Sequence, residues 1–125
     1  MKKIAICLTL LSLILFGVLM FKQFSIASME SQVDANMAKI LRADMPYSSN
    51  PYYYIKNNAD FHNIVQLGQD VLPILQDKIK NSENDGLQEY ILAIAIERIA
   101  QTNLKMSKET TWETAKGFTQ QLKGY

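Results

Sequence analysis

Ile91-Leu92-Ala93-Ile94-Ala95-Ile96 is the stretch that decides the fold, because it places six consecutive apolar residues inside one segment. That segment runs from Leu87 to about Thr102, and its charged residues lie toward its two ends. A helix that is apolar on nearly every face has neighbours on several sides. We therefore predict that residues 87–102 form the central core helix of an all-α body.

The segments before this helix carry residues that begin and end helices. Asn50-Pro51 predicts an N-cap followed by proline at the first position of a short helix through Ile55. Asp60 and Asp70 are expected to cap the next two helices. Gly68 lies between those helices and suits the left-handed position at a helix C-terminus.

The remaining segments complete a chain of helices joined by polar loops. Residues 81–86 form a polar loop in which Asp85, three residues before Gln88, has the spacing of a capping box. Ser107 is expected to cap a last helix. The residues expected on one face of that helix are Trp112, Ala115, Thr119 and Leu122. Since no stretch alternates with period two for long, we predict an all-α fold.

The 43 residues from Asp60 to Thr102 resemble one HEAT-type (HEAT or armadillo-like) helical repeat. The resemblance depends on the spacing of Leu67-Gly68 to Leu72-Pro73 and on the segment Leu92-Ala93-Ile94-Ala95-Ile96. Such repeats are about 40–47 residues long. The sequence from Ser49-Asn50-Pro51-Tyr52 to Asn58 is also similar to the first residues of the domain in small exported bacterial proteins that carry such a unit.

The resemblance implies a HEAT-like domain over residues 47–125 that binds proteins through its helical surface. It departs from the repeat families in one respect, because only one repeat is visible and a solenoid needs at least about three. We therefore expect a compact helical bundle in which the flanking helices act as caps.

Residues 28–46 are predicted to form an amphipathic connecting helix. Apolar residues recur at steps of three and four on one stripe that begins just before this range, namely Ile26, Met29, Val33, Met37, Ile40 and Leu41. The stripe is expected to pack on the domain, with partner binding as the alternative. Met45-Pro46 ends the helix, because the residue before proline is kept out of helical geometry.

Residues 1–27 are predicted to be a signal anchor or a signal peptide. Residues 4–21 contain no charge and follow Lys2 and Lys3. At about 1.5 Å per residue they span about 27 Å, close to the roughly 30 Å core of a bilayer. This length exceeds the run of about 7–15 residues in a signal peptide and favours a retained anchor.

Cleavage near Ala27 is the alternative, since Ser25-Ile26-Ala27 has small residues in a suitable pattern. Lys22 lies between the apolar run and this site and speaks against cleavage. Either way, Lys2 and Lys3 are expected to hold the N-terminus in the cytoplasm. We expect a single-pass protein of the cell membrane with its C-terminal domain extracytoplasmic, or a secreted one.

Charge excludes one class of partner. The chain has thirteen basic and twelve acidic residues, and three of the basic residues (Lys2, Lys3 and Lys22) precede residue 28. The body therefore carries ten basic and twelve acidic residues. No run of five like charges occurs, so we predict no nucleic-acid binding.

The residue inventory argues against catalysis. His62 is the only histidine, and Cys7, the only cysteine, lies within the apolar run. No glycine-rich phosphate loop is present, and residues 81–85 lack the ligand spacing of an EF-hand. Glu97 beside Arg98 is either an ion pair facing a groove or an ordinary pair of surface charges. We predict that the protein is not an enzyme and has no catalytic residue, metal or cofactor.

Four tyrosines, Tyr47, Tyr52, Tyr53 and Tyr54, form the candidate interaction surface. Tyrosine gives a large contact area at low entropic cost and is enriched in binding hot spots. Carbohydrate stacking is a variant, and packing of the rings on the core is the alternative. We predict an interaction module that binds a protein or another component of the bacterial envelope. The alternative is an immunity or inhibitor protein against a secreted toxin or hydrolase.

Overall fold

The computed structural model describes residues 1–42, 48–101 and 113–122, and every regular element within these ranges is helical. The elements are α1 (Lys2–Arg42), α2 (Pro51–Ile55), α3 (Ala59–Gln66), the 3-10 turn η1 (Gln69–Val71), α4 (Leu72–Asn81), α5 (Leu87–Ile99) and α6 (Ala115–Gln121). The predicted all-α fold, an N-terminal apolar helix followed by a helical bundle, is confirmed.

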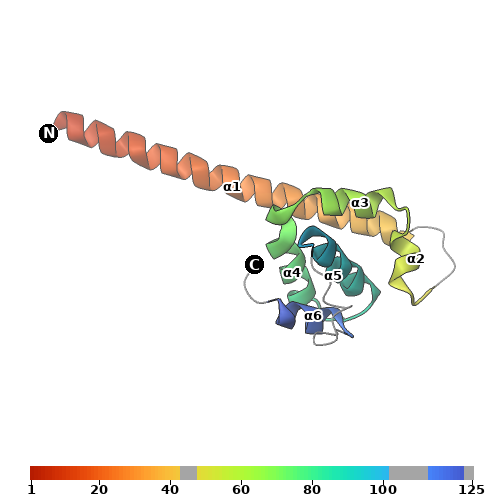
Figure 1. The fold of residues 1–125 in the computed structure, drawn as a ribbon. Coiled ribbons are helices and arrows are strands. Elements are labelled where there is room, and N and C mark those ends of the chain that lie inside the picture. The colour runs from red at the N-terminus through yellow and green to blue at the C-terminus, as the bar shows by residue number, and fades with distance from the viewer. Residues whose placement is uncertain (43–47, 102–112, 123–125) are drawn as a thin grey trace.

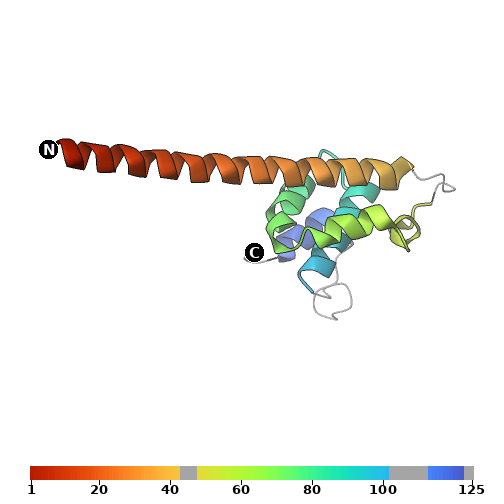
Figure 2. The same cartoon turned by 90° about the horizontal axis from the view of Figure 1, so that it is seen from above.

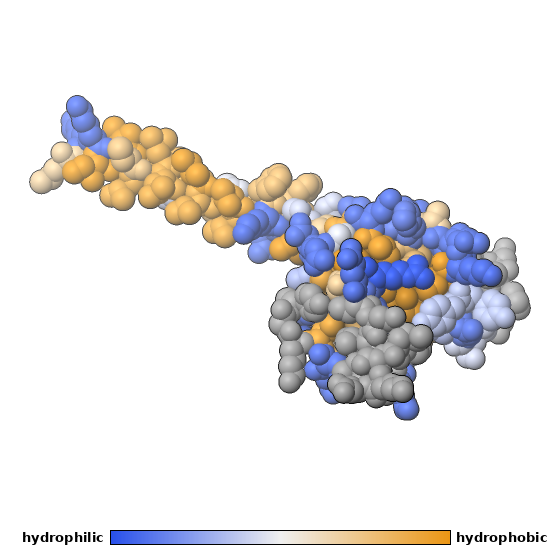
Figure 3. All heavy atoms as spheres, viewed as in Figure 1, coloured by the Kyte–Doolittle hydropathy of each residue, from blue (hydrophilic) through white to orange (hydrophobic). Residues whose placement is uncertain are grey.

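Helix α1 is a single helix of 41 residues that projects far beyond the bundle (Figure 1). The bundle lies against its C-terminal half only, as the view from above shows (Figure 2). The projecting half is covered by apolar side chains (Figure 3). The helix therefore continues without interruption across residues 27 and 28, where the export segment and the connecting helix were expected to meet.

The C-terminal half of α1 is part of the core. Val33, Met37 and Ile40 are at most 3% exposed, and Met29 packs partly against the same cluster. Full burial of such a side chain contributes about 1.5–3 kcal/mol. The predicted packing of the stripe on the domain is confirmed for these residues, whereas Ile26 stays 46% exposed.

Helix α5 is the central element, as predicted. It contacts α2, α3, α4 and α6, and the six residues from Ile91 to Ile96 are at most 2% exposed. The helix ends at Ile99, because Ala100 is its C-cap and Gln101 has a positive φ of 55°. It is thus shorter than the predicted segment.

Asparagine side chains cap the short helices. The Asn50 side chain accepts a hydrogen bond from the backbone N–H of Tyr52 at 3.1 Å, which confirms the Asn50-Pro51 prediction. Asn58, and not Asp60, caps α3 by accepting from the N–H of Phe61 at 3.0 Å. The expected Asp60 cap was wrong, because Asn58 already occupies the cap position and Asp60 lies in the first turn.

Two further predicted caps were displaced. Gly68 has the expected positive φ of 76°, but its ψ of −160° lies outside the left-handed helical region. Asp70 lies within η1, which precedes α4, and α4 has no side-chain cap. At α5 the capping carboxylate is Glu89, which accepts from the N–H of Gly86 at 2.9 Å; Asp85 and Gln88 do not form the expected box.

Thr114 caps α6 by accepting from the N–H of Gly117 at 3.1 Å. Ala115 and Thr119 are buried, as expected for one face of this helix. The predicted positions Ser107 and Trp112 lie outside the described residues.

Candidate interaction surface

Helix α2 places the tyrosines at the end of the bundle opposite the projecting half of α1 (Figures 1 and 2). The Asn50 cap and Pro51 fix the start of this one-turn helix. Successive helical residues are about 100° apart around the axis, so adjacent rings point in different directions. Tyr52 and Tyr53 are consequently 43% and 59% exposed.

Tyr54 does not belong to this surface. It is only 8% exposed, lies in the core, and its hydroxyl accepts a hydrogen bond from the N–H of Ser48 at 3.3 Å. For this ring the alternative interpretation, packing on the core, is correct, because the third ring of the turn faces inward. Tyr47 lies outside the described residues.

The two exposed rings border a groove of about 220 Å³, which we call the distal groove. It is lined by Asn50, Tyr52, Tyr53 and Lys56. Aromatic faces beside an amide and an ammonium group are suited to contacts with a peptide or a sugar.

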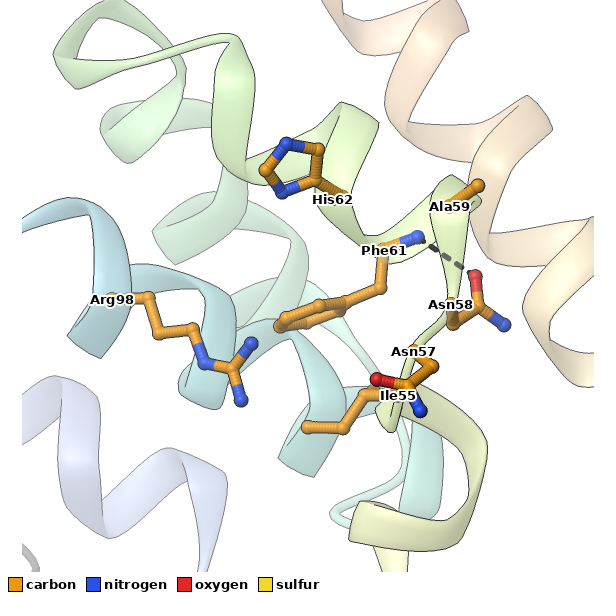
Figure 4. Close-up of a pocket in the computed structure, with 7 residues that line it drawn as sticks. All are labelled: Ile55, Asn57, Asn58, Ala59, Phe61, His62 and Arg98. Atoms are coloured by element: carbon orange, nitrogen blue, oxygen red, sulfur yellow. Dashed lines mark hydrogen bonds between the residues drawn. The ribbon is translucent and has the colours of Figure 1, made fainter.

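A second cavity, of about 350 Å³, lies where α2 leads into α3 and faces the end of α5 (Figure 4). We call it the Arg98 pocket; it is lined by Ile55, Asn57, Asn58, Ala59, Phe61, His62 and Arg98. The Arg98 guanidinium lies over the Phe61 ring, 4.9 Å from its centroid. Sequence reasoning misses this pairing, because the two residues are distant in the chain and only Glu97 is an evident neighbour of Arg98.

Asn58 and His62, two polar residues of the Arg98 pocket, form side-chain hydrogen bonds within the protein. Asn58 uses both ends of its amide, since it caps Phe61 and donates to the carbonyl of Tyr54 at 3.0 Å. The His62 Nε2 atom lies 3.0 Å from the Gln66 amide nitrogen.

Glu89 is the buried charged residue of the described part of the chain, and its contacts are structural. Burial alone would raise the pKa of Glu89, but hydrogen bonds from the Ser82 hydroxyl, at 2.6 Å, and from backbone N–H groups outweigh it. Lys116 adds a favourable charge, and the net result is a lowered pKa. Within the same residues, no group of three or more potential metal ligands occurs.

The projecting half of α1 is the second functional feature. It is one helix that is long and apolar enough, by length and composition, to cross a membrane, or to act as a signal sequence. None of the residues in its most apolar window is buried. Large side chains are exposed along it, including Phe16, Phe21 and Phe24 at 64–75%.

Comparisons with protein families, with curated proteins and with solved structures gave no match to this chain.

Proposed function

We propose that this protein is a non-enzymatic interaction module of the bacterial envelope, which α1 holds at the outer face of the cell membrane. The observation that carries the proposal is that a helix able to cross a bilayer is also a core element of the bundle. Val33, Met37 and Ile40 are buried on the helix whose residues 4–21 form the apolar run.

The position of the bundle relative to the bilayer follows from helix geometry. Met29, the first residue that packs on the core, is eight residues beyond Phe21. Eight residues correspond to about 12 Å along the axis, which exceeds the roughly 5–8 Å thickness of one headgroup region. The bundle would therefore lie next to the membrane, with α2 turned away from it.

The alternative, secretion after cleavage near Ala27, keeps the same domain. Val33, Met37 and Ile40 all lie beyond that site, so a released chain retains the buried part of α1. The intact mass of the protein in membrane and medium fractions distinguishes the two forms, since cleavage removes residues 1–27.

The distal groove is the partner surface in this proposal. Tyr52 and Tyr53 expose large aromatic area on a one-turn helix that is fixed by an N-cap, a proline and the buried Tyr54. A rigid aromatic pair costs little entropy to order on binding. The HEAT-type resemblance, which implies protein binding on a helical surface, agrees with this assignment.

Site-specific photo-crosslinking in the native host tests the proposal. A photoreactive phenylalanine replaces Tyr53 in the full-length chain, and the matched control replaces Gln120, an exposed residue of α6. We expect a discrete adduct with an envelope component from position 53, and loss of that adduct when Tyr52→Ala is added. Equal labelling from both positions, or none from position 53, would contradict the proposal. The immunity or inhibitor alternative stays a prediction, which co-expression with an adjacent toxin or hydrolase gene would test.

A further inference from the structure

We propose that the Arg98 pocket is a carboxylate-binding site, filled by an acidic side chain or the C-terminal carboxylate of a partner protein. This inference rests on the proposed function in one respect, namely that the carboxylate belongs to a partner protein. The affinity for a carboxylate follows from the groups that line the pocket.

The charge of the pocket selects an anion. Its lining contains one cation, the Arg98 guanidinium, and no aspartate or glutamate. By contrast, the cavity between α1 and α4 includes Glu30 and Asp77 beside Lys78, and the one between α2 and α5 includes Asp85. The lining of the distal groove also contains one cation, Lys56, and no acid, but the Arg98 pocket is the one whose cation is a guanidinium.

The acidic neighbours of the pocket in sequence, Asp60 and Glu97, both have interactions of their own. Asp60, beside the lining residues Ala59 and Phe61, lies 3.7 Å from Lys39 of α1. Among the described residues, no ion pair is formed by Arg98. Its guanidinium contacts the face of the Phe61 ring, and no described carboxylate lies within 4.0 Å of it.

Stacking on Phe61 determines which group of the ligand fits. A guanidinium that lies over an aromatic face keeps its N–H donors in its own plane, where they form a fork that matches the two oxygens of a carboxylate. In Figure 4 the guanidinium reaches into the space between Phe61, Ile55 and Asn57. Phe61 and Ile55 line the bottom of the pocket but are only 1% and 3% exposed, so the ligand contacts the pocket mainly through its carboxylate.

Asn57 supplies the second donor. It is exposed and has a positive φ of 55°, the left-handed conformation in which asparagine is tolerated. Unlike that of Asn58, its side chain forms no hydrogen bond with another residue of the described ranges. In Figure 4 the Asn57 amide oxygen, and not its nitrogen, is on the side of Arg98, so a carboxylate held by Arg98 can accept from this amide after the amide turns. A single cation with one amide suits a monoanion better than a phosphate dianion.

The test uses the full-length chain in lipid nanodiscs, labelled with ¹⁵N-arginine. The sequence contains only two arginines, Arg98 and Arg42, so two side-chain Nε–H signals are expected and Arg42→Lys assigns them. Arg42, exposed at the end of α1, is the internal control. The probes are N-acetylglutamate amide for an acidic side chain and N-acetylalanine for a C-terminus, each compared with its neutral amide at constant ionic strength.

We expect either carboxylate to shift the Arg98 signal in a saturable manner, with no saturation at Arg42 and no shift by the neutral amides. The probe that saturates first identifies the source of the carboxylate. Arg98→Lys keeps the charge but loses the fork, and should weaken binding by about fivefold or more. Because this variant lacks the Arg98 signal, its binding is followed in uniformly ¹⁵N-labelled protein at the backbone amides of Asn57 and Phe61. Asn57→Gly keeps the backbone conformation and should weaken binding by about threefold, measured at the Arg98 signal.

Equal, non-saturating shifts of both arginine signals would overturn the inference. So would saturation by the neutral amides, or tighter binding of inorganic phosphate than of either carboxylate. Because no partner protein is present, failure here leaves the crosslinking result at Tyr53 untouched. Conversely, carboxylate binding without a crosslinked partner would leave the pocket valid and contradict the proposed function.

Discussion

The Lys78 ammonium of α4 lies 2.7 Å from the Asp34 carboxylate of α1, and 3.3 Å from Glu30 one turn earlier on the same helix. The Lys78 side chain is 20% exposed, whereas the two carboxylates are more than half exposed. Burial acts to lower the pKa of Lys78, but the hydrogen bonds and charges of Asp34 and Glu30 outweigh it and raise the pKa. This cluster fastens the long helix to the bundle outside the hydrophobic core.

Replacing Lys78 by Gln should destabilise the protein by about 1 kcal/mol or less, because pairs with exposed partners contribute little. Thermal unfolding of the full-length chain in detergent micelles measures the effect. The difference from wild type should shrink in high salt, which screens exposed charges. Lys80→Gln, at an exposed position of the same helix, is the control and should be neutral. A loss that does not depend on salt would mean that packing, and not charge, is responsible.

Ile40→Ala should cost about 2–4 kcal/mol, because Ile40 is fully buried and truncation leaves a cavity in the core. The neighbouring Leu41 is 38% exposed, so Leu41→Ala is a matched control that should cost less than about 1 kcal/mol. Denaturant unfolding in micelles measures both. Similar losses at the two positions would contradict the packing of α1 on the bundle.

Glu89 should make stability depend on acid pH. Its pKa in the folded protein lies below the ordinary value of 4.5. Its contribution is therefore complete above that ordinary value, and it is lost as the pH falls through the lower folded-state pKa. We expect Glu89→Gln to be destabilising at pH 7 and to approach wild-type stability as the solution is acidified. Ser82→Ala, which removes one hydrogen bond to the carboxylate, should give a smaller change in the same direction. A difference that is constant with pH would exclude this role.

Gly68 and Gly86 should respond in opposite ways to alanine. Gly68 has a φ of 76° and a ψ of −160°, a region that is essentially restricted to glycine, so Gly68→Ala should cost about 1–3 kcal/mol. Gly86 has a φ of −115°, and a Cβ there would lie 3.8 Å from a Glu89 carboxylate oxygen, an ordinary contact. Gly86→Ala should therefore be nearly neutral. Thermal unfolding of the two variants measures both effects. A Gly68→Ala variant as stable as wild type would contradict the backbone conformation at Gly68.

Local patterns predict the elements of this fold better than their boundaries. Short-range chemistry predicts the Asn50-Pro51 start of α2, the positive φ of Gly68 and the central helix α5, and all three were expected. Aspartate is a good capping residue, which is why the sequence alone favours Asp60 as the cap of α3. The neighbouring Asn58 holds that place instead, because its amide both caps Phe61 and donates to Tyr54.

Contacts between distant segments could not be predicted. Lys78 and Asp34 are far apart in the chain, and so are Arg98 and Phe61, and no local pattern indicates either pair. The prediction that the tyrosines are exposed was correct for Tyr52 and Tyr53 but not for Tyr54. The orientation of the one-turn helix α2 determines which ring faces inward. That orientation is set by how α2 packs on α5 and α1, which is a property of the whole fold.

Helix α1 runs for 41 residues, about 60 Å, with no break between its free half and its packed half. If this helix is anchored in a bilayer, a change in its tilt moves the attached bundle with it. A thinner or thicker membrane that alters the tilt would therefore change the distance between α2, with its exposed tyrosines, and the lipid surface. Cells that vary bilayer thickness would thereby vary how far this protein reaches.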